Sequence, residues 1–273
     1  MPAQQILFVK LSSLGDVIHH LPAVTDLARH RPGARIAWAV EEAYADLVRL
    51  HPSVAESIPV GLRALRRHPL QARRWRRLEA ARRALRSRRW DYVVDTQGLL
   101  KSALWGVQAR GPLAGYDGAS AREPLAARFY SRRAAVSRSL QAVDRNRRLA
   151  AAHLGYPLPD RAPDFGIRAP AGSWQAGAPS AALIPCASRP EKLWPEANWI
   201  AVGQRLAAAG LTPVLVWGNA EELARAERIA AACGGRVPPF LSVADMAAVL
   251  GRARQIVGLD TGFSHLAAAF GQP

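Results

Sequence analysis

Three short segments of the chain combine residues that could bind a phosphate group or move a proton. The first is KLSSLGD (10–16), which joins an apolar run to a helical pattern. Its small residues would let backbone N–H groups approach an anion, as they do at helix N-termini. Asp16 has two interpretations, because a carboxylate on such a turn could act as a general base or as the N-cap of the helix. The cap alone would explain an aspartate there.

The second segment is RPEKLWP (189–195), in which Lys192 is one of only three lysines. Arginine supplies nearly all other cations, so lysine here suggests a compact point charge for a phosphate in a confined site. An ordinary surface lysine before a proline-started helix is the alternative. Glu222 opens a later helix, where it could stabilise the helix end or hold ribose hydroxyls.

The third segment is DTGFSH (260–265). Asp-Thr-Gly also occurs in aspartic proteases, but those domains are all-β, whereas this triplet precedes an alanine-rich helix, so we reject that activity. The pattern instead predicts a helix N-terminus at which the N–H groups of Thr261 and Gly262 and the hydroxyl of Ser264 meet phosphate oxygens. His265 could join them, although a capped or partly buried histidine is the alternative.

These segments belong to a chain in which apolar runs alternate with helical patterns. The apolar runs predict strands at 6–11, 35–40, 55–60, 91–95, 181–185, 212–217 and 255–259. Helical spacing predicts helices between them, including 16–30, 70–87, 99–109, 141–153, 195–209 and 220–233. This alternation is typical of βαβ units and predicts an α/β fold with parallel sheets.

A segment rich in proline and glycine, 156–179, separates two Rossmann-like halves. It predicts domains at 1–155 and 180–273, with the best ligand site in a cleft facing the carboxyl ends of both sheets. The second half has only three convincing strands and stops directly after a helix, so we expect that a C-terminal piece is missing.

The chain is strongly basic, with a formal charge of +16. Residues 1–166 carry 28 Lys and Arg against 14 Asp and Glu, a net charge of +14, whereas residues 167–273 carry a net charge of +2. Twelve arginines between positions 63 and 89 are opposed locally only by Glu79. They could form a solvated helix face, or an anion-binding surface, since guanidinium groups pair with phosphates and carboxylates.

Composition and local patterns exclude several classes. With 49% hydrophobic and 21% charged residues, the chain is globular, and no apolar run is long enough to predict a transmembrane helix. The N-terminus lacks the pattern of a signal peptide, so we expect a cytoplasmic protein. Cys186 and Cys233 form no CxxC or Cys/His cluster, and His19 and His20 point in different directions on a helix. We therefore predict no disulfide framework and no metal site.

Six motifs together carry a resemblance that runs through the whole chain in order. They are KLSSLGDVIHHLPA (10–23), WAVEE (38–42), DTQGLLKS (95–102), AREPLA (121–126) with Phe129-Tyr130 after it, KLWP (192–195) and DTGFSHL (260–266). With these motifs the sequence resembles the lipopolysaccharide heptosyltransferase I family, within glycosyltransferase family 9.

The resemblance implies a GT-B fold, with two Rossmann-like domains facing each other across a cleft, and an inverting transferase without a catalytic metal or cofactor. The enzyme would move L-glycero-D-manno-heptose from ADP-heptose to the Kdo of Kdo2-lipid A in lipopolysaccharide inner-core biosynthesis. The N-terminal domain would bind the acceptor and the C-terminal domain the nucleotide sugar. The protein would be cytoplasmic and peripheral on the anionic surface of the inner membrane.

The resemblance also implies roles for particular residues. Asp16 would be the general base. The donor would contact Lys192, Ser188, Glu222, Asp260, Thr261, Gly262 and His265, and the acceptor would contact Arg63, Arg66, Arg67 and Arg122. Family members continue for several tens of residues past position 273.

Two other interpretations stay open. A charge of +16 suits a nucleic-acid-binding protein, but no helix-turn-helix, RRM, KH or OB signature occurs, and the arginine run lacks repeated aromatic residues. We therefore expect no nucleic-acid partner. The second interpretation is a relative of the transferases that either has no catalytic activity or uses another nucleotide sugar or acceptor.

Overall fold

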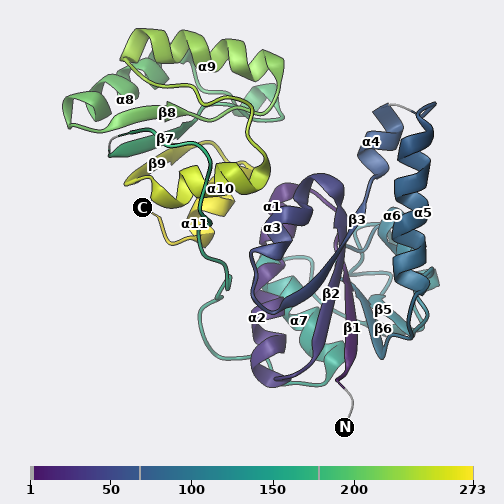
Figure 1. Cartoon of the computed structure of the whole chain (residues 1–273). Coiled ribbons are helices and arrows are strands. Elements are labelled where there is room, and N and C mark those ends of the chain that lie inside the picture. The colour runs from purple at the N-terminus through teal and green to yellow at the C-terminus, as the bar shows by residue number, and fades with distance from the viewer. Residues whose placement is uncertain (1–2, 68, 178, 273) are drawn as a thin grey trace. The chain divides into compact units, whose positions relative to one another are not determined.

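The computed structural model describes residues 3–67, 69–177 and 179–272. The chain divides into two compact units, Met1–Gly166 and Ile167–Pro273 (Figure 1). The boundary between them falls inside the segment 156–179, where the sequence predicts a linker. Each unit is built from parallel strands and helices.

In the described part of the first unit, six parallel strands form one sheet in the order β3-β2-β1-β4-β5-β6. The strands are β1 (Gln5–Val9), β2 (Arg35–Glu41), β3 (Val54–Val60), β4 (Tyr92–Asp95), β5 (Leu113–Tyr116) and β6 (Arg132–Ala134). The central strands β1 and β4 are almost completely buried, because helices cover both faces of such a sheet. This is the strand order of a Rossmann fold.

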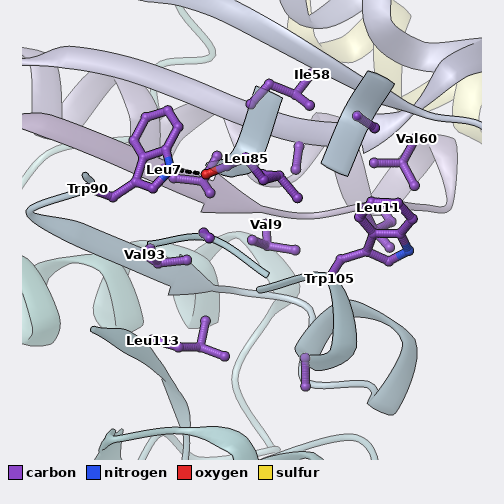
Figure 2. Close-up of a cluster of buried hydrophobic side chains, with 14 of the residues drawn as sticks. Leu7, Val9, Leu11, Ile58, Val60, Leu85, Trp90, Val93, Trp105 and Leu113 are labelled. Carbon is purple, nitrogen blue, oxygen red and sulfur yellow. Dashed lines mark hydrogen bonds between the residues drawn. The ribbon is translucent and has the colours of Figure 1, made fainter. Parts of the chain in front are cut away.

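The helices of the first unit form a layer on each face of its sheet. They are α1 (Leu14–Ile18), α2 (Leu21–His30), α3 (Ala45–Arg49), α4 (Leu62–Arg67), α5 (Ala72–Arg86), α6 (Leu100–Gly106) and α7 (Ala142–Leu154), with 3-10 turns η1 (Glu42–Tyr44) and η2 (Pro124–Phe129). Leu7 of β1, Leu85 of α5 and Trp105 of α6 belong to one cluster of buried side chains (Figure 2). Phe8, which points to the opposite face, lies edge-on against His20, and α2 packs against α7.

The described part of the second unit holds a smaller parallel sheet in the order β8-β7-β9. Its elements are β7 (Ser180–Ile184), η3 (Pro190–Lys192), α8 (Glu196–Ala208), β8 (Thr212–Leu215), α9 (Ala220–Cys233), α10 (Val243–Arg252), β9 (Gln255–Gly258) and α11 (Gly262–Ala269). Leu183 of β7, Trp199 of α8 and Ile229 of α9 share one buried cluster. The pattern of alternating strands and helices therefore continues through this unit.

Two expectations from the sequence need correction. The helix predicted over 16–30 is two helices, α1 and α2, because Pro22 in the first turn of α2 has no N–H to donate to the carbonyl of Ile18. The apolar patterns also do not predict β5, β6 or η2. Strand β6 has the sequence RRA, with both arginines exposed, so it joins the sheet through backbone hydrogen bonds without an apolar run.

A buried ion pair joins α7 to α2 and also contacts the last segment of the first unit. Nε of Arg147 in α7 donates to Oδ2 of Asp26 in α2 at 2.7 Å, and the two side chains are 4% and 1% exposed. The same guanidinium donates to the carbonyl oxygens of Pro159 and Arg161. Because a buried charge without its partner is strongly unfavourable, Asp26 holds this whole arrangement in place.

Replacing Asp26 should therefore destabilise the fold. We expect Asp26→Ala to lower the free energy of unfolding by about 3–5 kcal/mol, because the Arg147 guanidinium would stay buried without its counter-charge. Asp46→Ala is the control, since it removes the partner of Arg49 in an exposed pair and should change stability by less than about 1 kcal/mol. Denaturant unfolding of both variants measures the difference, and equal losses would contradict the assignment.

Candidate active site

The candidate residues of the first unit lie where the strand order reverses. The chain passes from β1 outward to β2 and β3 and then returns to β4, which pairs with the other side of β1. The loops that leave β1 and β4 therefore diverge at the carboxyl ends of these strands. Doubly wound sheets bind their ligands at this position, and the segments 10–16 and 95–102 form it.

The side chain of Gln97 holds these two loops together. Its Oε1 accepts from the backbone N–H of Leu11 at 2.7 Å, and its Nε2 donates to the carbonyl of Ser12 at 2.9 Å. The backbone N–H of Gln97 donates to Asp95 at 2.8 Å. Gly98 follows with a φ of 68°, a conformation that residues with a Cβ rarely adopt. Buried hydrogen bonds thus fix the loop that leads to Asp16.

Asp16 combines a structural role with a half-buried charge. Ser13 is the N-cap of α1 and Asp16 its third residue, so the interpretation of Asp16 as the N-cap is wrong. Its Oδ2 accepts from the Ser13 backbone N–H at 2.9 Å and lies 3.3 Å from NH1 of Arg122. Burial raises the pKa of Asp16, but the charge of Lys10, the Ser13 hydrogen bonds and the charge of Arg122 together hold it below its ordinary value. The carboxylate is therefore ionised at neutral pH, as a proton acceptor must be.

Lys10 is a buried ammonium group for which the sequence predicts no role. Its side chain is 5% exposed, and Nζ donates to the carbonyl of Thr96 at 2.9 Å and to Oδ1 of Asn146 at 3.2 Å. Burial lowers the pKa of Lys10 to about 8, while the charges of Asp16 and Asp95 oppose this shift. Lys10 is therefore largely protonated at neutral pH and is the charge that most favours ionised Asp16.

Among the described side chains, Arg63, Lys101 and Arg122 gather at the same edge. Arg63 donates from NH1 to the hydroxyl of Tyr44 at 2.5 Å, and Lys101 donates from Nζ to Oγ of Ser12 at 2.8 Å. Burial and the charge of Arg63 lower the pKa of Lys101, while nearby carboxylates oppose the shift. Such a group of donors suits an anion with carboxylates or phosphates.

The predicted acceptor residues divide into two groups. The structure brings Arg63 and Arg122 to the edge that carries Asp16. The side chains of Arg66 and Arg67, on the last turn of α4, lie outside the described residues.

One sequence signal could have found more of the site. The chain has only three lysines, and Lys10, Lys101 and Lys192 all lie near the carboxyl ends of strands, among the candidate residues. The rarity that singles out Lys192 therefore applies equally to the other two.

In the second unit, the loops after β7, β8 and β9 leave one edge of the sheet and carry the predicted donor residues. Asp260 joins two of these loops, because its Oδ2 lies 2.5 Å from Nζ of Lys192 and its Oδ1 lies 3.2 Å from Nε2 of His265. The Lys192 and His265 side chains are 36% and 34% exposed, so both reach solvent. Thr261 is the N-cap of α11, which begins at Gly262.

Ser188 and Glu222 line a hollow of about 310 Å³ in the second unit. Oε2 of Glu222 accepts from the backbone N–H of Gly218 at 2.7 Å, and the Glu222 N–H donates to the N-cap Asn219 at 3.0 Å. Glu222 therefore stabilises the start of α9, and its binding of ribose hydroxyls stays a prediction.

The Ser264 hydroxyl makes a hydrogen bond inside the chain, and its contact with a phosphate stays a prediction. Its O–H donates to the carbonyl of Leu259 at 2.5 Å. A phosphate oxygen needs a donor, and this one is already engaged within the chain.

Some site types are absent from the part of the chain that the structure describes. It contains no group of three or more His, Cys, Asp or Glu side chains that could hold a metal ion. None of the helices in residues 3–67, 69–177 and 179–272 is both long and apolar enough to span a membrane. Cys186 and Cys233 are buried free thiols.

Comparison with known proteins decides the family. The model of glycosyltransferase family 9 (heptosyltransferase) matches residues 78–273. The chain belongs to glycosyltransferase family 9. This family 9 chain is 45% identical to lipopolysaccharide heptosyltransferase 1 of Pseudomonas aeruginosa, over 98% of this chain and 77% of that protein. It is 39% identical to lipopolysaccharide heptosyltransferase 1 of Salmonella typhimurium, over 98% of this chain and 86% of that protein.

Solved family structures agree with this assignment. E. coli heptosyltransferase WaaC with ADP is 37% identical and superposes with a TM-score of 0.89, over 98% of this chain and 85% of that one. E. coli heptosyltransferase II, at 21% identity and a TM-score of 0.78, shares the fold. The predicted α/β fold of two Rossmann-like units, of the GT-B type, is confirmed. The predicted family and enzyme class are confirmed too, and the protein is a glycosyltransferase.

The electrostatic link between Lys10 and Asp16 can be tested by pH dependence. We expect Lys10→Met to raise the pKa of Asp16, because the variant removes the charge that most favours the carboxylate. If transfer requires ionised Asp16, the acid limb of the kcat/KM profile should then move to higher pH. Arg122→Gln removes a smaller contribution and should move the limb less. An acid limb that stays in place in Lys10→Met would show that the two groups are not coupled.

Proposed function

We propose that this glycosyltransferase moves L-glycero-D-manno-heptose from ADP-heptose to the Kdo of Kdo2-lipid A, a step of lipopolysaccharide inner-core biosynthesis. The observation that carries the proposal is that the ionised carboxylate of Asp16 lies near three cations, Arg63, Lys101 and Arg122. The carboxylate can take a proton, and the cations can bind the negative charges of the acceptor substrate. The donor is supported by the 37% identical E. coli heptosyltransferase WaaC, which has a solved structure with ADP-2-deoxy-2-fluoro heptose.

The reaction requires a base on the acceptor side. The acceptor hydroxyl attacks the anomeric carbon of heptose, its proton passes to the Asp16 carboxylate, and the bond to the diphosphate breaks so that ADP leaves. A single displacement of this kind inverts the anomeric configuration. The lowered pKa of Asp16 keeps the carboxylate ionised before attack, and Arg122 can hold an acceptor carboxylate beside it.

The second unit has positively charged and N–H groups that suit the diphosphate of a nucleotide sugar. Lys192 can neutralise charge on the leaving diphosphate, and the N–H groups that open α11 at Gly262 can bind phosphate oxygens. Asp260 orients Lys192 and His265 through its two oxygens. Ser188 and Glu222, on the hollow beside these loops, suit the nucleoside.

The acceptor sets the proposed location. Kdo2-lipid A carries carboxylates and phosphates in a membrane leaflet, so we place the enzyme in the cytoplasm, peripheral on the anionic inner membrane surface. The net charge of +14 over residues 1–166 supports this placement, because each cation near an anionic leaflet contributes about 1 kcal/mol of attraction.

The role of Asp16 gives a direct test. We expect Asp16→Asn to lower kcat by about 10²- to 10⁴-fold, because the amide cannot take the proton of the acceptor hydroxyl. Binding of ADP-heptose, measured by calorimetry, should stay near normal. Incubation with ADP-heptose and Kdo2-lipid A, followed by mass analysis of the lipid, reports transfer.

Lys192→Ala serves as the comparison for Asp16→Asn, since it should weaken donor binding as well as turnover. If Asp16→Asn keeps near-normal turnover, Asp16 acts only at the helix end. If the wild-type chain transfers no heptose but uses another nucleotide sugar, the proposed donor is wrong.

The cations at the same edge should determine acceptor affinity. We expect Arg63→Gln and Lys101→Met each to raise the KM of a water-soluble, deacylated Kdo acceptor by about tenfold, because each removes a charge-assisted hydrogen bond. The KM of ADP-heptose should hardly change. Steady-state kinetics with each substrate varied in turn measures both values.

The matched control is Arg83→Gln/Arg86→Gln at the C-terminal end of α5, which removes two exposed charges away from the carboxyl ends of the strands. An equal rise of the acceptor KM in this control would mean that bulk charge, rather than a site at the sheet edge, attracts the acceptor.

A further inference from the structure

Four large apolar side chains are exposed on adjoining elements of the first unit. Leu104 and Val107 lie three residues apart on α6 and its C-cap and are 50% and 47% exposed. Leu125 and Phe129 lie on η2 and are 51% and 39% exposed. Because α6 packs against η2, these four exposed side chains lie on adjoining elements, and together they are called the apolar face below. Exposed apolar side chains grouped in this way mark an interaction site.

Arginines border the apolar face. Nε of Arg82 on α5 donates to Oε1 of Gln108 at 2.7 Å, next to Val107, so α5 lies beside the end of α6. Figure 1 shows α5 and α6 on the same side of the sheet. Arg83 and Arg86 of α5 are exposed and make no ion pair within the described residues. Arg128, between the two apolar residues of η2, adds a further exposed cation.

The apolar face begins at the sheet edge that carries Asp16. Lys101, in the first turn of α6, donates to Ser12, and Arg122, two residues before η2, pairs with Asp16. Both elements then run away from this edge, with Leu104 one turn beyond Lys101 and Leu125 three residues beyond Arg122. The apolar face therefore follows directly, on both elements, from two cations of the candidate site, Lys101 and Arg122.

We infer that the apolar face is where the protein docks on an anionic phospholipid bilayer, with its four apolar side chains entering the headgroup region and the arginines of α5 contacting lipid phosphates. This inference rests on the proposed function, since it names the surface from which a membrane-borne acceptor reaches Asp16.

Charge complementarity favours a bilayer over the other occupants. A bilayer offers phosphates over a wide area with apolar carbon beneath them, which matches an apolar centre bordered by arginines. A second copy of the chain would bring its own arginines against Arg83, Arg86 and Arg128, so that like charges would oppose a symmetric contact.

Vesicle binding tests the inference without depending on catalysis. The full chain is sedimented with vesicles of phosphatidylethanolamine and phosphatidylglycerol, and separately with vesicles of phosphatidylcholine alone. We expect binding to the anionic vesicles, and a loss of affinity of about tenfold in Leu104→Gln/Leu125→Gln because less apolar surface enters the bilayer. Arg83→Gln/Arg86→Gln should lose about tenfold at low salt and less at high salt.

Arg148→Gln/Arg161→Gln is the matched control. It also removes two exposed arginines, but Arg148 lies on α7 and Arg161 contacts that helix, on the opposite face of the sheet. Its affinity for vesicles should fall by clearly less than that of Arg83→Gln/Arg86→Gln. Thermal unfolding of every variant should match the wild type, which shows that losses of binding do not come from unfolding.

Turnover separates this inference from the proposed function. The Leu104→Gln/Leu125→Gln variant should keep its rate on a soluble deacylated acceptor and lose rate on the acceptor embedded in vesicles. If the variants lose vesicle affinity as expected but the wild type transfers no heptose, the proposed reaction is contradicted and the docking face stays supported. The inference is overturned if the wild type does not bind anionic vesicles, if the α7 control loses as much affinity, or if sedimentation shows wild-type dimers that the apolar variant abolishes.

Discussion

The burial of one ammonium group, that of Lys10, determines the electrostatics of the candidate site in the first unit. A charge inside a protein is unfavourable unless hydrogen-bond acceptors and opposite charges surround it. Lys10 finds acceptors on Thr96 and Asn146 and opposite charges on Asp16 and Asp95. These partners come from β4 and its loop, α1 and α7, so the ammonium group holds three parts of the first unit in register. The same charge keeps Asp16 ionised, and it does so by making the carboxylate a weaker base.

Lys192 in the second unit differs from Lys10 in how deeply its ion pair is buried. The Lys192 and Asp260 side chains are 36% and 67% exposed, whereas Lys10 is 5% exposed. An exposed ion pair contributes little to stability, so Lys192 can exchange Asp260 for a phosphate at small cost in free energy. Lys10 has no such freedom, because leaving its partners would strand its charge in the interior. Lysine is thus a fixed charge in the first unit and, in the proposed function, an exchangeable charge in the second.

The sequence predicted elements whose stabilisation is local and missed those that depend on tertiary contacts. Strand β1 is an apolar run and was predicted to within two residues at each end. Strand β6, with the sequence RRA, has no such signal, because only its neighbour β5 makes it a strand. The place of Asp16 after an apolar run and the rarity of lysine at Lys192 predict these two residues, while Lys101 is brought to Ser12 from 89 residues away. No local pattern could show that contact, nor the engagement of the Ser264 hydroxyl with Leu259.

The arginines of the first unit differ in whether a carboxylate neutralises them. Arg147 is neutralised by buried Asp26, and Arg74 and Arg77 of α5 meet Glu42 on the side toward the sheet. The outward arginines of the same helix have few carboxylates near them in the described structure. The positive field of the first unit therefore stays unbalanced on the outer side of α5. Since arginine is spread over the whole unit by composition, the placement of the few acids decides which surface attracts an anionic partner.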